Sequence, residues 1–180
     1  FSAGLLFRCV NEPLLTIGVE ICEDLWVADP PSTHLAQGGA TLVLNPSASD
    51  ETVCKDAYRR TLLEATSGRL VCGYVYADAG WGESSTDLIY AGHSLIAENG
   101  TILAERRFAT GLTITEIDLQ KLAHERQRMT TYPADAPDLY PNYFALERTE
   151  TRLTRPVAPN PFVPADQGDR ATRCQEILTL

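Results

Sequence analysis

The sequence has no long apolar run, no metal-ligand spacing and no excess of basic residues. A membrane-spanning helix needs about 18 consecutive apolar residues, and no apolar stretch of this sequence is that long. Its 15 basic and 24 acidic residues give a net charge of −9, which argues against a nucleic-acid or anionic-membrane surface. Its five cysteines include no Cys-x-x-Cys pair and its three histidines form no metal-spaced cluster, so neither a disulfide framework nor a zinc site is indicated.

The composition is that of an ordinary globular protein. At 180 residues and 44% hydrophobic content, the chain is long enough for one domain with a sizeable core. Unpaired cysteines fit a reducing, cytoplasmic compartment. The chain opens at Phe1 and its single methionine is Met129, so we expect a piece of a longer protein.

Apolar periodicity predicts an α/β protein with a mixed sheet. Strands are expected at residues 5–10, 14–20, 41–44, 70–77, 94–97, 101–105 and 112–117. Helices are expected at 32–37 capped by Ser32, at 56–67 ending at Gly68, and from Asp118 to about Met129. Asn99-Gly100 predicts a tight hairpin. The proline-rich stretch from Thr130 to Arg170 predicts no strand, and a new helix is expected from Arg173.

One segment, GVEICEDLW, could carry a reactive thiol. In it a predicted strand runs directly into Cys22, where a nucleophile would have a rigid support and free backbone N–H groups would follow. The alternative is a buried Cys22 that acts as a small hydrophobe, as most free cysteines do. Glu23 and Asp24 oppose ionisation of a neighbouring thiol, so a positive group from elsewhere would be required.

Each of the three histidines is a possible partner of this thiol. His34 lies in a predicted surface helix and His124 on a charged helix face, so both are expected to be solvated. His93, just before a predicted strand, is the only one of the three expected to be buried.

Six collinear groups of segments resemble the glutaminase domain of NAD+ synthetases, a branch of the nitrilase superfamily. They are 18–26; 45–49; 74–77 with 82–84; 92–100; 118–119 with 125–126 and 128–131; and 173–177. The resemblance implies a nitrilase-like αββα sandwich with mixed sheets, incomplete in this chain. It also implies hydrolysis of the glutamine side-chain amide by a Glu–Lys–Cys triad, in which Cys22 is the catalytic nucleophile. The Glu and Lys would lie upstream of Phe1.

The resemblance further implies how substrate would be bound. Glu23 and Ser49 match the residues that bind the amino and carboxylate ends of glutamine, and the N–H of Glu23 would help to bind the oxyanion. Lys55 matches a substrate-contacting basic residue, although many relatives have Arg there, which would give a bidentate contact. Trp26 would form a wall of the pocket.

The same resemblance suggests a domain plan. Residues 1–130 would be the C-terminal part of the glutaminase domain, 131–172 an interdomain linker, and 173–180 the start of a synthetase domain. No metal or cofactor is expected in this chain, because ATP and Mg²⁺ would bind only in the synthetase domain that amidates nicotinic acid adenine dinucleotide. The expected partners are glutamine, the rest of the parent protein and further copies in a homo-oligomer, with no nucleic acid or membrane.

Two other hypotheses stay open. The chain could belong to a nitrilase-like amidase that acts on another small amide. It could also be a non-catalytic structural fragment, because a cysteine without its base and lysine should be nearly inert.

Overall fold

A computed structural model describes residues 4–133, 139–147, 149, 152, 154–157, 159–160 and 162–180. Within the described residues, seven strands form one mixed sheet in the order β6-β5-β4-β3-β2-β1-β7. The strands are β1 (Leu5–Cys9), β2 (Thr16–Val19), β3 (Leu42–Ser47), β4 (Gly73–Asp78), β5 (Ser94–Glu98), β6 (Thr101–Arg106) and β7 (Tyr140–Phe144). The expected α/β architecture with a mixed sheet is therefore confirmed.

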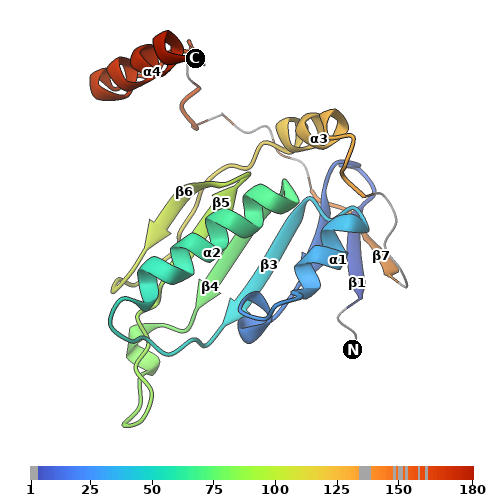
Figure 1. Cartoon of the computed structure of the whole chain (residues 1–180). Helices are drawn as coiled ribbons and strands as arrows, with labels where there is room; N and C mark the ends of the chain where they lie inside the picture. Colours follow the sequence, from blue (N-terminus) through green and yellow to red (C-terminus); the bar gives the residue numbers. More distant parts are fainter. Residues whose placement is uncertain are drawn as a thin grey trace. The chain divides into compact units, whose positions relative to one another are not determined.

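The centre of the sheet is parallel and its flanks are mixed. Strands β2, β3 and β4 run parallel, whereas β1 pairs antiparallel with β2, and the hairpin β5–β6 adds antiparallel to β4. Helix α1 (Pro31–Gln37) connects β2 to β3, and helix α2 (Lys55–Leu70) connects β3 to β4. Both connections between parallel strands advance in the same direction across the sheet. Because such connections are almost always right-handed, both helices lie on the same face of the sheet (Figure 1).

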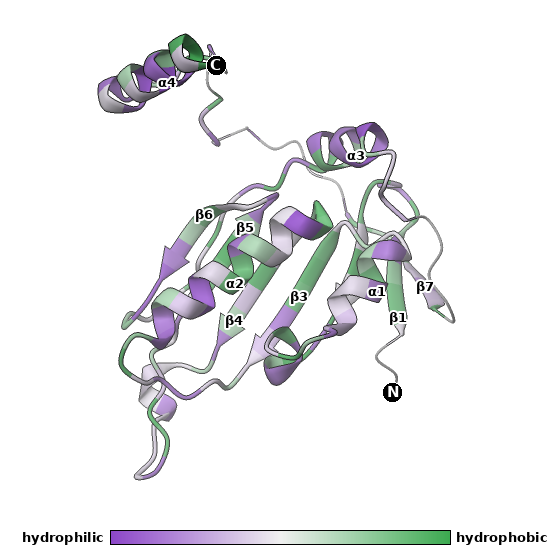
Figure 2. Cartoon of the chain, viewed as in Figure 1, coloured by the Kyte–Doolittle hydropathy of each residue, from purple (hydrophilic) through white to green (hydrophobic). Residues whose placement is uncertain are grey.

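The main core lies between this helical layer and the sheet. Leu63 and Leu70 of α2 pack with Val43, Tyr74 and Leu95 of the strands, all of them buried. In Figure 2 the strands under α2 are predominantly hydrophobic, whereas α2 carries hydrophilic residues on its outward side. This is the pattern expected when one stripe of a helix covers an apolar sheet.

Two local predictions are confirmed by backbone geometry. Asn99 and Gly100 both have positive φ, 45° and 85°, as a two-residue hairpin turn of the primed type requires. The side chain of Asp118 accepts a hydrogen bond from the N–H of Lys121 at 2.9 Å and caps α3 (Leu119–Arg128).

Two predicted helix ends were wrong. Ser32 is not the N-cap of α1, which begins after Pro30; instead the N–H of Ser32 donates to the carboxylate of Glu20 at 2.7 Å. Helix α2 continues through Gly68 to Leu70 and ends at Val71 with a positive φ. Gly68 serves a packing role, since a Cβ there would lie 3.2 Å from the Cα of Gly100.

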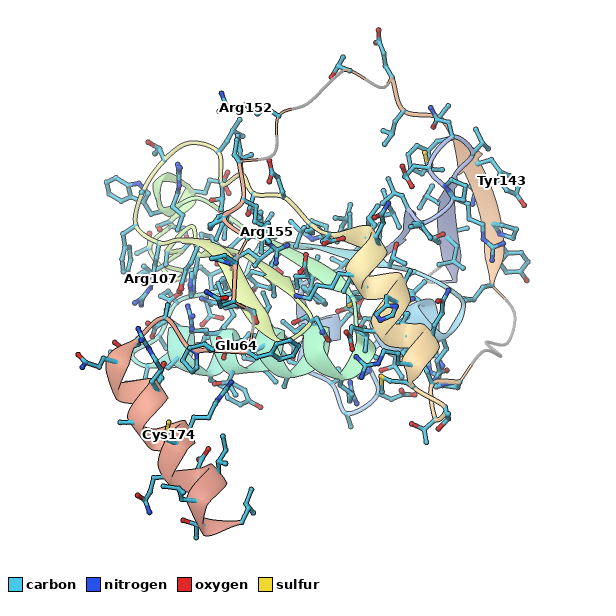
Figure 3. All side chains as sticks on the ribbon, turned by 90° about the horizontal axis from the view of Figure 1, so that it is seen from above. Glu64, Arg107, Tyr143, Arg152, Arg155 and Cys174 are labelled. Carbon is cyan, nitrogen blue, oxygen red and sulfur yellow. The ribbon has the colours of Figure 1, made fainter. Side chains whose placement is uncertain are left out.

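Predictions for the second half of the chain need three further corrections. Residues 112–117 form no strand: the carbonyls of Thr110 and Leu112 accept hydrogen bonds from Arg106 rather than from a neighbouring strand. The proline-rich stretch does contain a strand, β7, which pairs in parallel with β1. Proline is tolerated there because β7 is an edge strand, at the opposite end of the sheet from β6 and Arg107 (Figure 3).

The third correction concerns the last helix. Helix α4 (Gln167–Thr179) begins six residues earlier than Arg173, because Asp166 caps it by accepting from the N–H of Asp169 at 3.0 Å. By their internal contacts, residues 1–150 and 151–180 form two separate units, and α4 belongs to the second. In the part of the chain that the structure describes, no helix is both long and apolar enough to cross a membrane.

Candidate active site

The loops that follow the three parallel strands meet at one edge of the sheet, at the bottom of Figure 1. Strand β2 leads into a short 3₁₀ helix, η1 (Cys22–Leu25), β3 leads into the loop that carries Ser49, and β4 ends at Asp78. The carboxyl edge of parallel strands is where ligand sites of α/β proteins usually lie.

Cys22 occupies a strained turn directly after β2. Its φ is +50°, in the left-handed region that non-glycine residues enter at a cost of about 1–3 kcal/mol. Its N–H donates to Oδ1 of Asn45 at 2.8 Å, and the side chain is partly exposed. The strain and the partial exposure present the thiol at the sheet edge and disfavour the alternative of a buried small hydrophobe.

The turn leaves one backbone donor beside the thiol without a partner. Among the described residues, nothing accepts the N–H of Glu23, whereas the N–H of Asp24 donates to the carbonyl of Ile21 at 3.0 Å. The carboxylate of Asp24 turns back to accept from the N–H of Ile21 at 2.7 Å. A free N–H next to a nucleophile can bind a developing oxyanion.

A chain of buried polar side chains lies beneath this turn. Asn45 donates from Nδ2 to the hydroxyl of Tyr74 at 3.0 Å, and that hydroxyl donates to the carboxylate of Glu20. All three residues are at most 1% exposed. Burial and the neighbouring Glu20 carboxylate raise the pKa of Tyr74 well above its ordinary value. Because Glu20 also accepts from the N–H of Ser32, this chain ties the Cys22 turn to α1.

Lys55 and Trp26 come together at the start of α2. The ammonium of Lys55 lies 5.4 Å from the ring centroid of Trp26 and donates to the carboxylate of Asp50 at 2.7 Å. Hydrogen bonding from Lys55, together with its charge, lowers the pKa of Asp50. Trp26 also packs against Tyr58, with the ring centroids 5.6 Å apart.

Ser49 is buried in the loop after β3, at 6% exposure. Its N–H donates to Oδ1 of Asp78 at 2.9 Å, and its hydroxyl lies 3.4 Å from Nη2 of Arg59. Burial raises the pKa of Asp78. Ser49 is therefore fixed on both its backbone and its side chain.

The histidines are placed as expected, and none of them forms a hydrogen bond with Cys22. His93 is fully buried but contacts Arg59 and Glu105, His34 pairs with Asp29 at 3.2 Å, and His124 is exposed. The described residues contain no group of three or more His, Cys, Asp or Glu that could bind a metal ion.

Several residues of this edge were assigned no role from the sequence, although three of them lie in the segments that carry the resemblance: Glu20, Asn45, Arg59, Tyr74 and Asp78. Asn45 lies in the C-terminal half of β3 and Asp78 is the last residue of β4, positions near the carboxyl ends of buried strands that could have signalled them. Glu20, Arg59 and Tyr74 become recognisable only when their partners, distant in sequence, are known.

The family profile described as carbon-nitrogen hydrolase matches residues 1–127. The chain belongs to the carbon-nitrogen hydrolase family. Over 192 aligned residues it is 39% identical to the glutamine-dependent NAD(+) synthetase of Mycobacterium tuberculosis. This alignment covers 100% of this chain and 28% of the relative. It is 33% identical to the deaminated glutathione amidase of Mus musculus over 138 residues, 76% of this chain and 42% of the relative.

Solved structures agree on the fold. Nit3 of Saccharomyces cerevisiae, of the nitrilase superfamily, aligns with a TM-score of 0.57 at 22% identity, over 64% of this chain and 42% of that one. The glutamine-dependent NAD+ synthetase of Acinetobacter baumannii aligns with a TM-score of 0.53 at 27% identity, over 59% of this chain and 19% of that one. This protein thus has the nitrilase-superfamily fold, as the resemblance of its sequence motifs predicts. It spans about 28% of the length of the NAD(+) synthetases that it matches.

Proposed function

We propose that Cys22 is the nucleophile of a glutamine-hydrolysing site that supplies ammonia to an NAD+ synthetase. The observation that carries this proposal is the strained Cys22 turn with the unpartnered N–H of Glu23 beside it. The match of this whole chain to NAD(+) synthetases at 39% identity favours glutamine as the amide substrate.

The proposed reaction has two steps, acylation of Cys22 and hydrolysis of the thioester. The Cys22 thiolate attacks the side-chain amide carbon, and the N–H of Glu23 stabilises the oxyanion that forms. The C–N bond then breaks as the proposed Glu of the triad, which has taken the proton of the Cys22 thiol, gives that proton to the nitrogen; ammonia leaves and a thioester remains. Water adds to the thioester and gives a proton to a base, and the C–S bond breaks to release glutamate. The proposal assigns the base and the lysine of the triad to parts of the parent protein outside this chain.

The substrate's polar ends would bind on either side of the thiol. The Glu23 carboxylate is exposed and can pair with the ammonium group, while Ser49 offers a hydroxyl to the carboxylate. Lys55 already pairs with Asp50, so we assign it to the pocket wall with Trp26, where it also adds positive charge.

The parent protein would use the ammonia in an ATP- and Mg²⁺-dependent amidation of nicotinic acid adenine dinucleotide, at a domain outside this chain. We place residues 1–130 in the glutaminase domain, 131–172 in the connection and 173–180 at the start of the synthetase domain. A cytoplasmic homo-oligomer is part of the same proposal.

An amidase acting on another small amide is the second candidate. It is favoured by the 33% identity to the deaminated glutathione amidase, which extends over 76% of this chain. Glutamine and other small amides should therefore be compared as substrates of the full-length parent protein.

The decisive experiment measures NAD+ formation by the parent protein with glutamine or with free ammonia as nitrogen donor. Cys22→Ala should abolish the glutamine-driven reaction and retain the ammonia-driven one, because it removes the nucleophile alone. Cys174→Ala, which replaces an exposed cysteine on α4, is the matched control and should retain both. Glutamine-driven synthesis by Cys22→Ala at the wild-type rate would refute the nucleophile assignment.

A further inference from the structure

The loop that carries Ser49 rests on one fully buried arginine. Arg59 of α2 is 0% exposed and donates from Nη1 to Oε2 of Glu51 at 2.9 Å. Its other terminal nitrogen lies 3.4 Å from the Ser49 hydroxyl. Two of the three consecutive residues 49–51 therefore contact the same guanidinium.

A histidine orients this arginine. Nη1 of Arg59 lies 2.8 Å from Nδ1 of His93, and Nε2 of His93 lies 2.9 Å from Oε1 of Glu105. A guanidinium can only donate, so Nδ1 must be the acceptor and the imidazole proton must lie on Nε2, where it donates to Glu105. The contacts thus select one tautomer of His93 and link the Ser49 loop to strand β6.

The positive and negative side-chain charges around Arg59 are nearly equal in number. Glu51 also accepts from Arg107 at 2.9 Å, and Arg107 pairs with Asp56 at 2.8 Å. Burial opposes the charge of Arg59, yet its hydrogen bond to Glu51 and the nearby acidic groups leave its pKa raised. The guanidinium is therefore a permanent, rigid donor directly behind the loop.

We propose that Arg59, oriented by His93 and Glu51, is a positioning residue that fixes the Ser49–Glu51 loop and thereby sets the affinity for the amino-acid substrate. This inference rests on the proposed function, in which Ser49 binds the substrate carboxylate. Arg59 itself touches neither the reacting amide nor Cys22. Loss of its orientation should raise the KM for glutamine and change kcat much less, because the thiol and its oxyanion donor lie on a different loop.

Two substitutions of His93 separate its two hydrogen bonds. His93→Asn places an amide oxygen near the position of Nδ1 and can still accept from Arg59. His93→Gln places an amide nitrogen near the position of Nε2, so it can still donate to Glu105 but leaves Arg59 without this acceptor. A lost buried hydrogen bond to a charged group corresponds to about a 10- to 100-fold change in an equilibrium constant.

The test uses the full-length parent protein with His93→Asn, His93→Gln and, as the matched control, exposed His34→Gln. We expect His93→Gln to raise the KM for glutamine by about 10-fold or more, and His93→Asn to stay within about 3-fold of wild type. Inactivation by a diazoketone analogue of glutamine should slow in His93→Gln, whereas alkylation of Cys22 by iodoacetamide should not change. A merely structural defect would change both alkylation rates alike.

Amide hydrogen exchange supplies a readout that needs no activity. Residues 48–52 should exchange faster in His93→Gln than in wild type, and the η1 turn should exchange at the wild-type rate. Equal KM values for the two His93 variants, or unchanged exchange at 48–52, would overturn the positioning role. If the wild type hydrolyses no glutamine but the loop still exchanges faster in His93→Gln, the proposed function fails and the structural part of this inference stands.

Discussion

Two polar networks support the candidate site, and they differ in how much charge they contain. The network under Cys22 consists of Asn45, Tyr74 and Glu20, with one carboxylate and two neutral side chains. The network under Ser49 is ionic, with Arg59 and Arg107 facing Glu51 and Asp56. The first fixes the backbone of a strained turn, whereas the second fixes a loop.

The comparison shows which interaction suits which task. The single carboxylate of the first network, Glu20, lies two side chains away from the Cys22 turn, so this network adds little to the charge that Glu23 and Asp24 already place beside the thiol. The Ser49 loop follows a different strand, β3, and is anchored by a paired arginine. Breaking a buried ion pair costs more than removing a neutral hydrogen bond, so the two networks should respond differently to substitution.

The largest effect is expected in the ionic network. Arg59→Met should destabilise the protein by about 3–5 kcal/mol, because the buried Glu51 loses one of its two cationic partners. The free energy of unfolding in denaturant measures this loss. Arg60→Met, on the same helix at a 42%-exposed side chain, should cost less than about 1 kcal/mol. Equal costs for the two variants would contradict the assignment of a buried ion pair at Arg59.

A smaller effect is expected in the network under Cys22. Tyr74→Phe should cost about 1–3 kcal/mol, since it leaves the buried oxygen of Glu20 and the amide of Asn45 each one partner short. It should also lower kcat for glutamine more than it raises KM. Tyr58→Phe is the control: Tyr58 is 57% exposed, so loss of its hydroxyl should leave the unfolding free energy nearly unchanged.

The smallest effects are pH-dependent and should have opposite signs at Asp50 and Asp78. The pKa of Asp50 is lowered by Lys55, so its contribution to stability is present above about pH 4 and is lost as the pH falls through the folded-state pKa. The pKa of Asp78 is raised by burial, so its favourable contribution is present at low pH and is lost as the pH rises through the folded-state pKa.

Unfolding measured from pH 3 to pH 7 should separate these two carboxyl groups. Relative to wild type, Asp50→Asn should lose stability as the pH rises, whereas Asp78→Asn should gain it. The Asp50 effect should stay below about 1 kcal/mol, because its side chain is 48% exposed and the pair is screened by solvent. The same sign of slope for both variants would contradict the assignment of burial as the cause at Asp78.

The sequence alone determined the elements that depend on near neighbours. The hairpin at Asn99-Gly100, the Asp118 cap and the buried strands follow from residues within a few positions of one another. The motif around Cys22 was readable in the same way, because a strand, a thiol and two acids are contiguous. The carbon-nitrogen hydrolase family and the α/β class were therefore accessible without a structure.

Only the tertiary structure decided which residues surround the candidate site. Tyr74 lies 54 residues from Glu20 and His93 lies 34 residues from Arg59, and no local pattern marks either pair. The missed strand β7 has the same cause, since its pairing comes from β1, more than 130 residues away, rather than from its own apolar periodicity. Local propensity is enough to form a turn or a helix cap. A buried polar group, in contrast, needs a hydrogen-bond partner, and here that partner is distant in sequence. Only the tertiary fold places the two side by side.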